Sequence, residues 1–276
     1  MKLDKIFNIS EKVILVTGGT GQIGSNISKV FLDNGAKVVF LDKDMSKKEE
    51  IINDLKNDSK DLSVNAFFFK LDISIEDECI KVIRKIHQQF KKIDVLINAA
   101  AIDAKFDHSV KDNFNKEFKN FPINLLIQSL QINQLGLIQI TKEVCKYMSD
   151  SKQGNIINLG SIYSLVSPNH NLYDFKNDQK SIKPIDYVIS KSFIPNFSRY
   201  IATFYAKDGI RCNTLIPHGI IQNPRDDFVD NWKIISPIGR LCNIEELYGP
   251  FLFLASDASS YMTGATLIID GGWTAW

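Results

Sequence analysis

The strongest constraint on the fold is an alternation of short apolar runs with longer segments of helical periodicity. The apolar runs occupy residues 13–17, 37–41, 65–70, 95–98, 155–159, 210–215 and 267–270. Helical patterns cover residues 25–34, 75–90, 125–148 and 187–207. Several runs are almost continuous Val, Ile, Leu and Phe, which is typical of strands buried on both faces. The alternation predicts an α/β fold, a doubly wound parallel sheet of about seven strands with helices on both faces.

No linker rich in Pro, Gly or Ser divides the chain, so residues 1–276 are predicted to form one domain. Two polar, irregular segments interrupt the pattern, near residues 102–122 and 164–185. Both follow strands at their carboxyl ends, which is the edge where open α/β sheets bind ligands. We therefore expect these two insertions to act as substrate loops.

Charge and cysteine content argue against several classes of protein. The 33 basic and 32 acidic side chains give a formal net charge of +1, which offers no attraction for nucleic acid or an anionic membrane. No apolar stretch approaches the ~18 residues of a membrane span, and the first residues lack the apolar core of a signal peptide. The four cysteines are too far apart in sequence to suggest a metal or redox pair. We expect a cytoplasmic protein with reduced cysteines and no metal.

A glycine-rich turn follows the first predicted strand directly. Residues 17–24 read Thr-Gly-Gly-Thr-Gly-Gln-Ile-Gly and lead into a predicted helix. Glycines in this position permit a tight turn and let backbone N–H groups approach a pyrophosphate, which the helix dipole also attracts. The arrangement predicts a Rossmann-type dinucleotide site with these contact residues: Gly18, Thr20, Gly21, Gln22, Ile23 and Gly24.

Acidic residues end the next two predicted strands. Asp42 lies 18 residues after Gly24. A carboxylate there accepts hydrogen bonds from the adenosine ribose and repels a 2′-phosphate, so it favours NAD over NADP, although the adjacent Lys43 softens that preference. Asp72 and Ile73 follow the third predicted strand. We expect them at the adenine, and the sequence leaves open that Asp72 instead caps the next helix.

Tyr187 and Lys191 lie four residues apart in a predicted helix and therefore share one face. A free phenol has a pKa of ~10, and a neighbouring cation lowers that pKa by favouring the phenolate. Tyr187 can then exchange a proton with a substrate hydroxyl or carbonyl, while Lys191 also reaches the nicotinamide ribose. Ser161, just past the fifth predicted strand, is placed to hold the substrate oxygen. Asn133, inside a long predicted helix, is a candidate to hold a water or a backbone group, with core packing as the alternative.

Together these motifs resemble the short-chain dehydrogenase/reductase family along nearly the whole chain. The resemblance extends to residues 98–101, to residues 210–213 with Pro217, to residues 256–264 and to the Asp-Gly-Gly at 270–272. It implies NAD as the cofactor, a homodimer or homotetramer, and a catalytic tetrad of Asn133, Ser161, Tyr187 and Lys191. In that tetrad Asn133 would anchor a proton-relay water through Lys191. Besides Tyr187 and Lys191, the implied cofactor contacts in the later part of the chain are Asn98, Ala99, Ala100, Pro217, Gly219 and Ile220.

Three departures from the family pattern stand out. The glycine spacing is that of the extended, sugar-nucleotide branch, although the chain ends in the Asp-Gly-Gly motif of single-domain members. Asn-Ala-Ala-Ala at 98–101 replaces the usual Asn-Asn-Ala-Gly, which removes a second Asn side chain. Between Ser161 and Tyr187 lie 25 residues, about twice the usual gap, and this insertion is expected over the substrate pocket. Tyr163 and His218 are candidates for substrate contact, with packing as the alternative.

The chain also resembles, more loosely, a sub-branch of the family found in flagellin modification and surface-polysaccharide synthesis, and this resemblance indicates which class of substrate to expect. It favours an NAD(H)-dependent oxidoreductase that interconverts a secondary hydroxyl and a ketone on a sugar or sugar derivative of surface-glycan biosynthesis. Two alternatives stay open: an epimerase or dehydratase that keeps its NAD bound, and a non-catalytic dinucleotide-binding regulator. The missing C-terminal domain of extended members argues against the first, and the presence of Tyr187 and Lys191 argues against the second.

Overall fold

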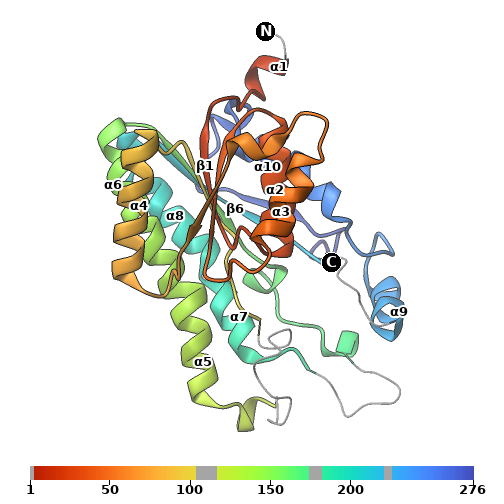
Figure 1. Ribbon diagram of the computed structural model, residues 1–276. Helices are drawn as coiled ribbons and strands as arrows, with labels where there is room; N and C mark the ends of the chain where they lie inside the picture. The colour runs from red at the N-terminus through yellow and green to blue at the C-terminus, as the bar shows by residue number, and fades with distance from the viewer. Residues whose placement is uncertain (1–2, 104–116, 174–181, 221–225) are drawn as a thin grey trace.

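All seven predicted strands are present and form one parallel sheet (Figure 1). The computed structural model describes residues 3–103, 117–173, 182–220 and 226–276. The strand order is β3-β2-β1-β4-β5-β6-β7. The strands are β1 (Val13–Thr17), β2 (Lys37–Asp42), β3 (Ala66–Lys70), β4 (Val95–Asn98), β5 (Gly154–Leu159), β6 (Ile210–Pro217) and β7 (Thr266–Ile269). The predicted doubly wound α/β architecture is confirmed.

Helices cover both faces of the sheet. One face carries α2 (Gln22–Asp33), α3 (Lys48–Lys56) and α10 (Tyr248–Ala255), and the other carries α4 (Glu76–Phe90), α6 (Leu137–Ser151) and α8 (Ile194–Phe204). At the end of the molecule opposite α1 (Leu3–Ile6) lie α5 (Ile123–Leu130), α7 (Ile185–Ser192) and α9 (Asp226–Ile235) (Figure 1). Short 3-10 segments connect these elements: η1 (Leu62–Asn65), η2 (Phe118–Asn120), η4 (Ile162–Ser164), η5 (His170–Tyr173), η6 (Ala206–Asp208), η7 (Ile244–Leu247) and η8 (Asp257–Ser259).

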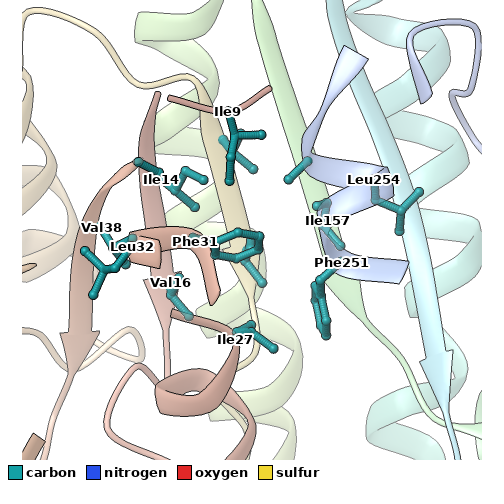
Figure 2. Packing of buried hydrophobic residues seen from close by; sticks show 14 of the residues in the cluster. Ile9, Ile14, Val16, Ile27, Phe31, Leu32, Val38, Ile157, Phe251 and Leu254 are labelled. Atoms are coloured by element: carbon teal, nitrogen blue, oxygen red, sulfur yellow. The ribbon is translucent and has the colours of Figure 1, made fainter. Parts of the chain in front are cut away.

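Alternate residues of each central strand pack into opposite core layers. In β1, Ile14 and Val16 pack with Phe31 of α2, as Figure 2 shows, whereas Val13 and Leu15 pack with α4 and α6 on the other face. Removal of each such side chain from water contributes about 1.5–3 kcal/mol. Because both faces are buried, these strands read as continuous apolar runs rather than as an alternation of apolar and polar residues.

The helix predicted over residues 125–148 is interrupted by η3 (Gln131–Gly136), which is a π-helical segment between α5 and α6. The wider π turn redirects side chains relative to an unbroken α-helix. Gly136, at its end, lies against Ile73, where a Cβ would come within 2.8 Å of the Ile73 Cγ1 atom. The glycine thus lets the helix pass close to the segment after β3.

The helix predicted over residues 187–207 is divided into α7 and α8. Pro195 lies in the first turn of α8, and it has no N–H group to donate to the carbonyl of Lys191. The hydroxyl of Ser164 donates to that carbonyl at 2.7 Å. The break therefore ties α7 to the segment that follows β5.

The centre of the sheet is the point where the chain changes direction. β1 pairs with β4 although β2 and β3 come between them in sequence. Where the connections that follow two neighbouring strands run to opposite sides of the sheet, a crevice forms outside the carboxyl ends of those strands.

Among the helices of the described residues, none has the length and apolar character needed to cross a membrane.

Candidate active site

A cavity of about 790 Å³ opens at the carboxyl ends of β1, β2, β4, β5 and β6. Its size and its place at the switch point of the sheet suit a small-molecule or cofactor site. All sequence-predicted contact residues except Asn98 and Asn133 line it: Gly18, Thr20, Gly21, Gln22, Ile23, Gly24, Asp42, Asp72, Ile73, Ala99, Ala100, Ser161, Tyr163, Tyr187, Lys191, Pro217, His218, Gly219 and Ile220.

The glycine-rich turn is packed so tightly that side chains are excluded. Gly18 has a φ of +66°, and a Cβ there would lie 2.9 Å from the Cα atom of Ala100. A Cβ on Gly24 would lie 2.1 Å from the carbonyl oxygen of Gly18. Gly21 is the N-cap of α2 and contributes no side-chain cap. This concave turn, with the positive end of the helix dipole behind it, fits a pyrophosphate.

Asp42 is held at the rim of the cavity by two backbone groups. Its carboxylate accepts the N–H groups of Thr20 at 3.2 Å and of Asp44 at 3.1 Å. Carboxylate oxygens have further lone pairs for ribose hydroxyls. Lys43 and Lys47 line the same part of the cavity, so cationic groups stand beside the acidic one.

Asp72 and Ile73 line the cavity near the end of β3, and their contact with the adenine stays a prediction. The Asp72 carboxylate accepts the backbone N–H of Ser74 at 2.9 Å and its hydroxyl at 2.6 Å. Because α4 begins at Glu76 with Ile75 as its N-cap, Asp72 closes a local turn and is not the helix cap considered from the sequence.

Asn98 does not line the cavity, and its role as a cofactor contact stays a prediction. It is the last residue of β4, and its side chain donates to Thr141 Oγ1 at 2.9 Å and to Asn158 Oδ1 at 2.8 Å inside the core. The residues after it do line the cavity. The N–H groups of Ala99 and Ala100 both donate to Thr17 Oγ1 at 3.1 Å, which fixes this segment next to the glycine turn.

Tyr187, Ser161 and Lys191 converge at the inner end of the cavity. A side-chain hydrogen bond joins Tyr187 to Ser161. The Lys191 ammonium donates to the carbonyl of Leu159 at 3.0 Å and lies 5.9 Å from the centroid of the Tyr187 ring. Two elements therefore build this end of the site, α7 with its tyrosine and lysine and the segment after β5 with its serine.

Burial dominates the ionisation of these groups. It raises the pKa of Tyr187, Asp103 raises it further, and the hydrogen bond with Ser161 lowers it. Burial also lowers the pKa of Lys191 to about 8, and Asp103 acts in the opposite direction. Burial of the phenol and the Asp103 carboxylate together outweigh the lowering of the Tyr187 pKa by Ser161, and the lowering by Lys191 expected from the sequence stays a prediction.

Asn133 clamps two parts of the site together. Its Oδ1 atom accepts the N–H of Ile102 and its Nδ2 atom donates to the carbonyl of Ile102, both at 2.8 Å. Nδ2 also donates to Ser190 Oγ at 2.9 Å. Among the roles considered from the sequence, the geometry matches a hold on backbone groups, and the water relay through Lys191 stays a prediction.

Aromatic side chains surround the part of the cavity beyond Tyr187. The hydroxyls of Tyr163 and Tyr173 lie 2.8 Å apart. The ring of His218 lies 4.2 Å from Trp232 and 4.6 Å from Trp273 between ring centroids. Burial lowers the pKa of His218 to about 3, so the imidazole is neutral near pH 7 and acts as a hydrogen-bonding group rather than a cation.

The cavity residues missed in the sequence include Asp103, Lys183, Phe228 and Trp232. Signals existed for two of them. Asp103 lies two residues after the Asn-Ala-Ala-Ala segment at a strand end, and Lys183 lies four residues before Tyr187 in the sequence. Phe228 and Trp232 belong to α9, whose helical pattern was not recognised. Among the residues that the structure describes, no group of three His, Cys, Asp or Glu side chains is placed to hold a metal ion.

Comparisons with known proteins agree with this geometry. A family model described as enoyl-(acyl carrier protein) reductase matches residues 19–274. The chain is 26% identical to the post-translational flagellin modification protein A of Campylobacter coli, over 96% of this chain and 99% of that protein. It is 27% identical to an NAD-dependent glycerol dehydrogenase of Listeria innocua, over 98% and 97% of the two chains.

Among solved structures, a short chain dehydrogenase from Leptospira borgpetersenii with bound NAD+ superimposes with a TM-score of 0.83. It is 29% identical, and the match covers 99% of this chain and 97% of that one. The family match, the fold and the dinucleotide-sized cavity agree: the chain belongs to the short-chain dehydrogenase/reductase family and is an NAD(P)-dependent oxidoreductase.

Proposed function

We propose that the protein interconverts a secondary hydroxyl and a ketone on a sugar or sugar derivative of surface-glycan biosynthesis, with NAD(H) as its cofactor. One observation carries the proposal: Tyr187, Ser161 and Lys191 meet in one cavity with the glycine-rich turn. The similarity to a flagellin modification protein and to a glycerol dehydrogenase supports a polyhydroxylated substrate.

When bound beside the glycine-rich turn, NAD(H) would supply the hydride-transfer chemistry of the proposed reaction. Tyr187 removes the hydroxyl proton in oxidation and returns it in reduction. Ser161, which is hydrogen-bonded to Tyr187, orients the substrate oxygen. Lys191 holds a positive charge near the phenol, and Asn133 keeps α7 in register with the segment after β4 through Ser190. General acid–base assistance of this kind accelerates a reaction by roughly 10²–10⁴-fold.

Asp42 supports NAD rather than NADP as the cofactor. Its carboxylate stands where the adenosine ribose would lie in this fold, and it would repel a 2′-phosphate. The ammonium groups of Lys43 and Lys47 would attract a 2′-phosphate and so act against that preference. We expect the effect of Asp42 to be the stronger one, because two backbone N–H groups hold its carboxylate in place.

The surroundings of His218 support a sugar as the substrate. Flat aromatic faces pack well against the apolar C–H faces of a sugar ring, while neutral polar groups bind its hydroxyls. Trp232, Tyr163 and the neutral His218 line the cavity together. The same proposal assigns direct substrate contact to Ser161, Tyr163 and His218.

A homodimer or homotetramer is part of the proposal. Large apolar side chains are exposed on the helices at one side of the molecule: Ile123 and Ile127 of α5, Ile189 of α7, and Tyr200 and Phe204 of α8. Burial of such a surface between subunits would stabilise an oligomer. Because the reaction draws on a cellular pool of NAD, we extend the proposal to a cytoplasmic location.

A substrate panel tests the proposal. The purified protein is incubated with NAD+ and with sugars, polyols, simple secondary alcohols, steroids or hydroxyacyl thioesters, and NADH absorbance is followed. NADH should accumulate with sugars or polyols. Turnover of steroids, thioesters or simple alcohols without turnover of sugars would contradict the substrate class. Sugar conversion without NADH accumulation would support the epimerase or dehydratase, and NADH binding without any turnover would support the regulator.

A further inference from the structure

A buried ion pair joins the two insertions beside Tyr187. Asp103 lies near the start of the first insertion and Lys183 near the end of the second. Their side chains form a salt bridge, in which that of Lys183 is 5% exposed and that of Asp103 is 15% exposed. The pair is therefore largely shielded from water and from screening by salt. Both residues line the cavity.

Lys183 lies against the ring of Tyr187. The Lys183 Nζ atom is 4.0 Å from the ring centroid, closer than the 5.9 Å of the Lys191 Nζ atom. A cation within about 6 Å of an aromatic face is attracted to it. The Lys183 ammonium therefore contacts both the Tyr187 ring and the Asp103 carboxylate. The titratable groups that line the inner part of the cavity with Tyr187 are Asp103, Tyr163, Tyr173, Lys183, Lys191 and His218.

We infer that the Asp103–Lys183 pair is a positioning device for the proton transfer, which fixes the ring of Tyr187 and balances the charge around its hydroxyl. The inference rests on the proposed role of Tyr187. A nearby ammonium favours the phenolate and a nearby carboxylate disfavours it. In agreement, Asp103 raises the pKa of both Tyr187 and Tyr163. Removal of either residue changes the charge beside the phenol by one unit, in opposite directions for the two residues.

Opposite shifts in the pH profile test this balance. Asp103→Asn removes a negative charge beside the phenol, so the pH profile of kcat/KM for oxidation should move to lower pH. Lys183→Met removes a positive charge there and should move the profile to higher pH. A charge within ~4–6 Å shifts a pKa by about 1–3, and we expect about one pH unit in each direction. The double variant should return toward the wild-type profile, because it removes both charges.

Controls separate this role from a structural one. Removal of one partner of a buried pair destabilises a protein more than removal of both, so urea unfolding of the double variant shows whether folding is affected. Lys183→Arg keeps the charge and should rescue the profile. Lys60→Met breaks an exposed ion pair with Asp33 and should leave the profile unchanged.

Single variants with no shift, or with shifts of the same sign, would overturn the inference. So would a double variant displaced as far as either single variant. If Tyr187→Phe is inactive in those cases, the proposed function still stands without the pair. Near-normal turnover by Tyr187→Phe would instead contradict the proposed function itself.

Discussion

Replacement of Gly24 by alanine should displace the glycine-rich turn. A Cβ there would lie 2.1 Å from the carbonyl oxygen of Gly18 and 2.8 Å from its carbonyl carbon. Carbon–oxygen contacts normally begin at about 3.3 Å. Both contacted atoms belong to the backbone, so the turn itself has to move by roughly 1 Å in a densely packed region.

The cost of this movement has two parts. Overpacking lowers the free energy of unfolding by about 1–3 kcal/mol. The higher helix propensity of alanine within α2 offsets up to about 1 kcal/mol of this loss. We expect a net loss of roughly 1–2 kcal/mol in the free energy of unfolding. A displaced turn also loses at least one hydrogen bond to a charged phosphate. Such a bond contributes about 1.5–3 kcal/mol, so NADH affinity should fall by about 10- to 150-fold.

Urea unfolding and NADH fluorescence titration measure the two effects separately. Gly249→Ala is the matched control, because a Cβ on this exposed α10 glycine meets nothing within 4 Å. That variant should gain up to about 1 kcal/mol in stability and bind NADH as the wild type does. Wild-type NADH affinity in Gly24→Ala would refute the assignment of the turn as the phosphate cradle.

Three further predictions concern single side chains. Asp42→Ala should raise the affinity for NADPH relative to NADH by about tenfold, because repulsion of the 2′-phosphate is lost while Lys43 remains; titration with both nucleotides measures the ratio, and an unchanged ratio would contradict the role of Asp42. Asn133→Ala should cost about 1–3 kcal/mol in urea unfolding for each backbone group of Ile102 left without a partner, and wild-type stability would show that the clamp contributes nothing. Burial lowers the pKa of His218 to about 3, against ~6.5 in an unfolded chain, so only the unfolded chain takes up this proton as the pH falls below ~6.5. Stability should therefore drop by about 2 kcal/mol between about pH 7 and pH 5 on this account, and His218→Phe should lack that drop; equal pH dependence of the two proteins would contradict it.

Most of the fold was readable from the sequence because the sheet is buried on both faces. The predicted strands at 13–17 and 95–98 have the observed bounds, and the others differ at their ends by at most two residues. Helix interruptions were harder to predict. Pro195 was a visible signal for the break between α7 and α8. Asn133 gave only weak warning of the π-helical η3, whose register depends on the contact between Gly136 and Ile73.

The candidate site was readable where its residues directly follow strands, because parallel strands bring their carboxyl ends to one edge. The parts of the site formed by contacts between side chains of the two insertions could not be predicted from the sequence. The contact of Lys183 with Asp103 joins positions 80 residues apart, and no local pattern specifies such a contact. The direction of the Asn98 side chain was also missed, because the pattern does not indicate which face of β4 its last residue occupies.

The central claim is that Tyr187 transfers the proton, and the most direct measurement compares Tyr187→Phe with the wild type in both turnover and NADH binding. We predict that kcat/KM falls by at least ~10²-fold while the variant still binds NADH, because the phenol hydroxyl acts on the substrate oxygen. Near-normal turnover in Tyr187→Phe, with NADH bound as tightly as in the wild type, would contradict it.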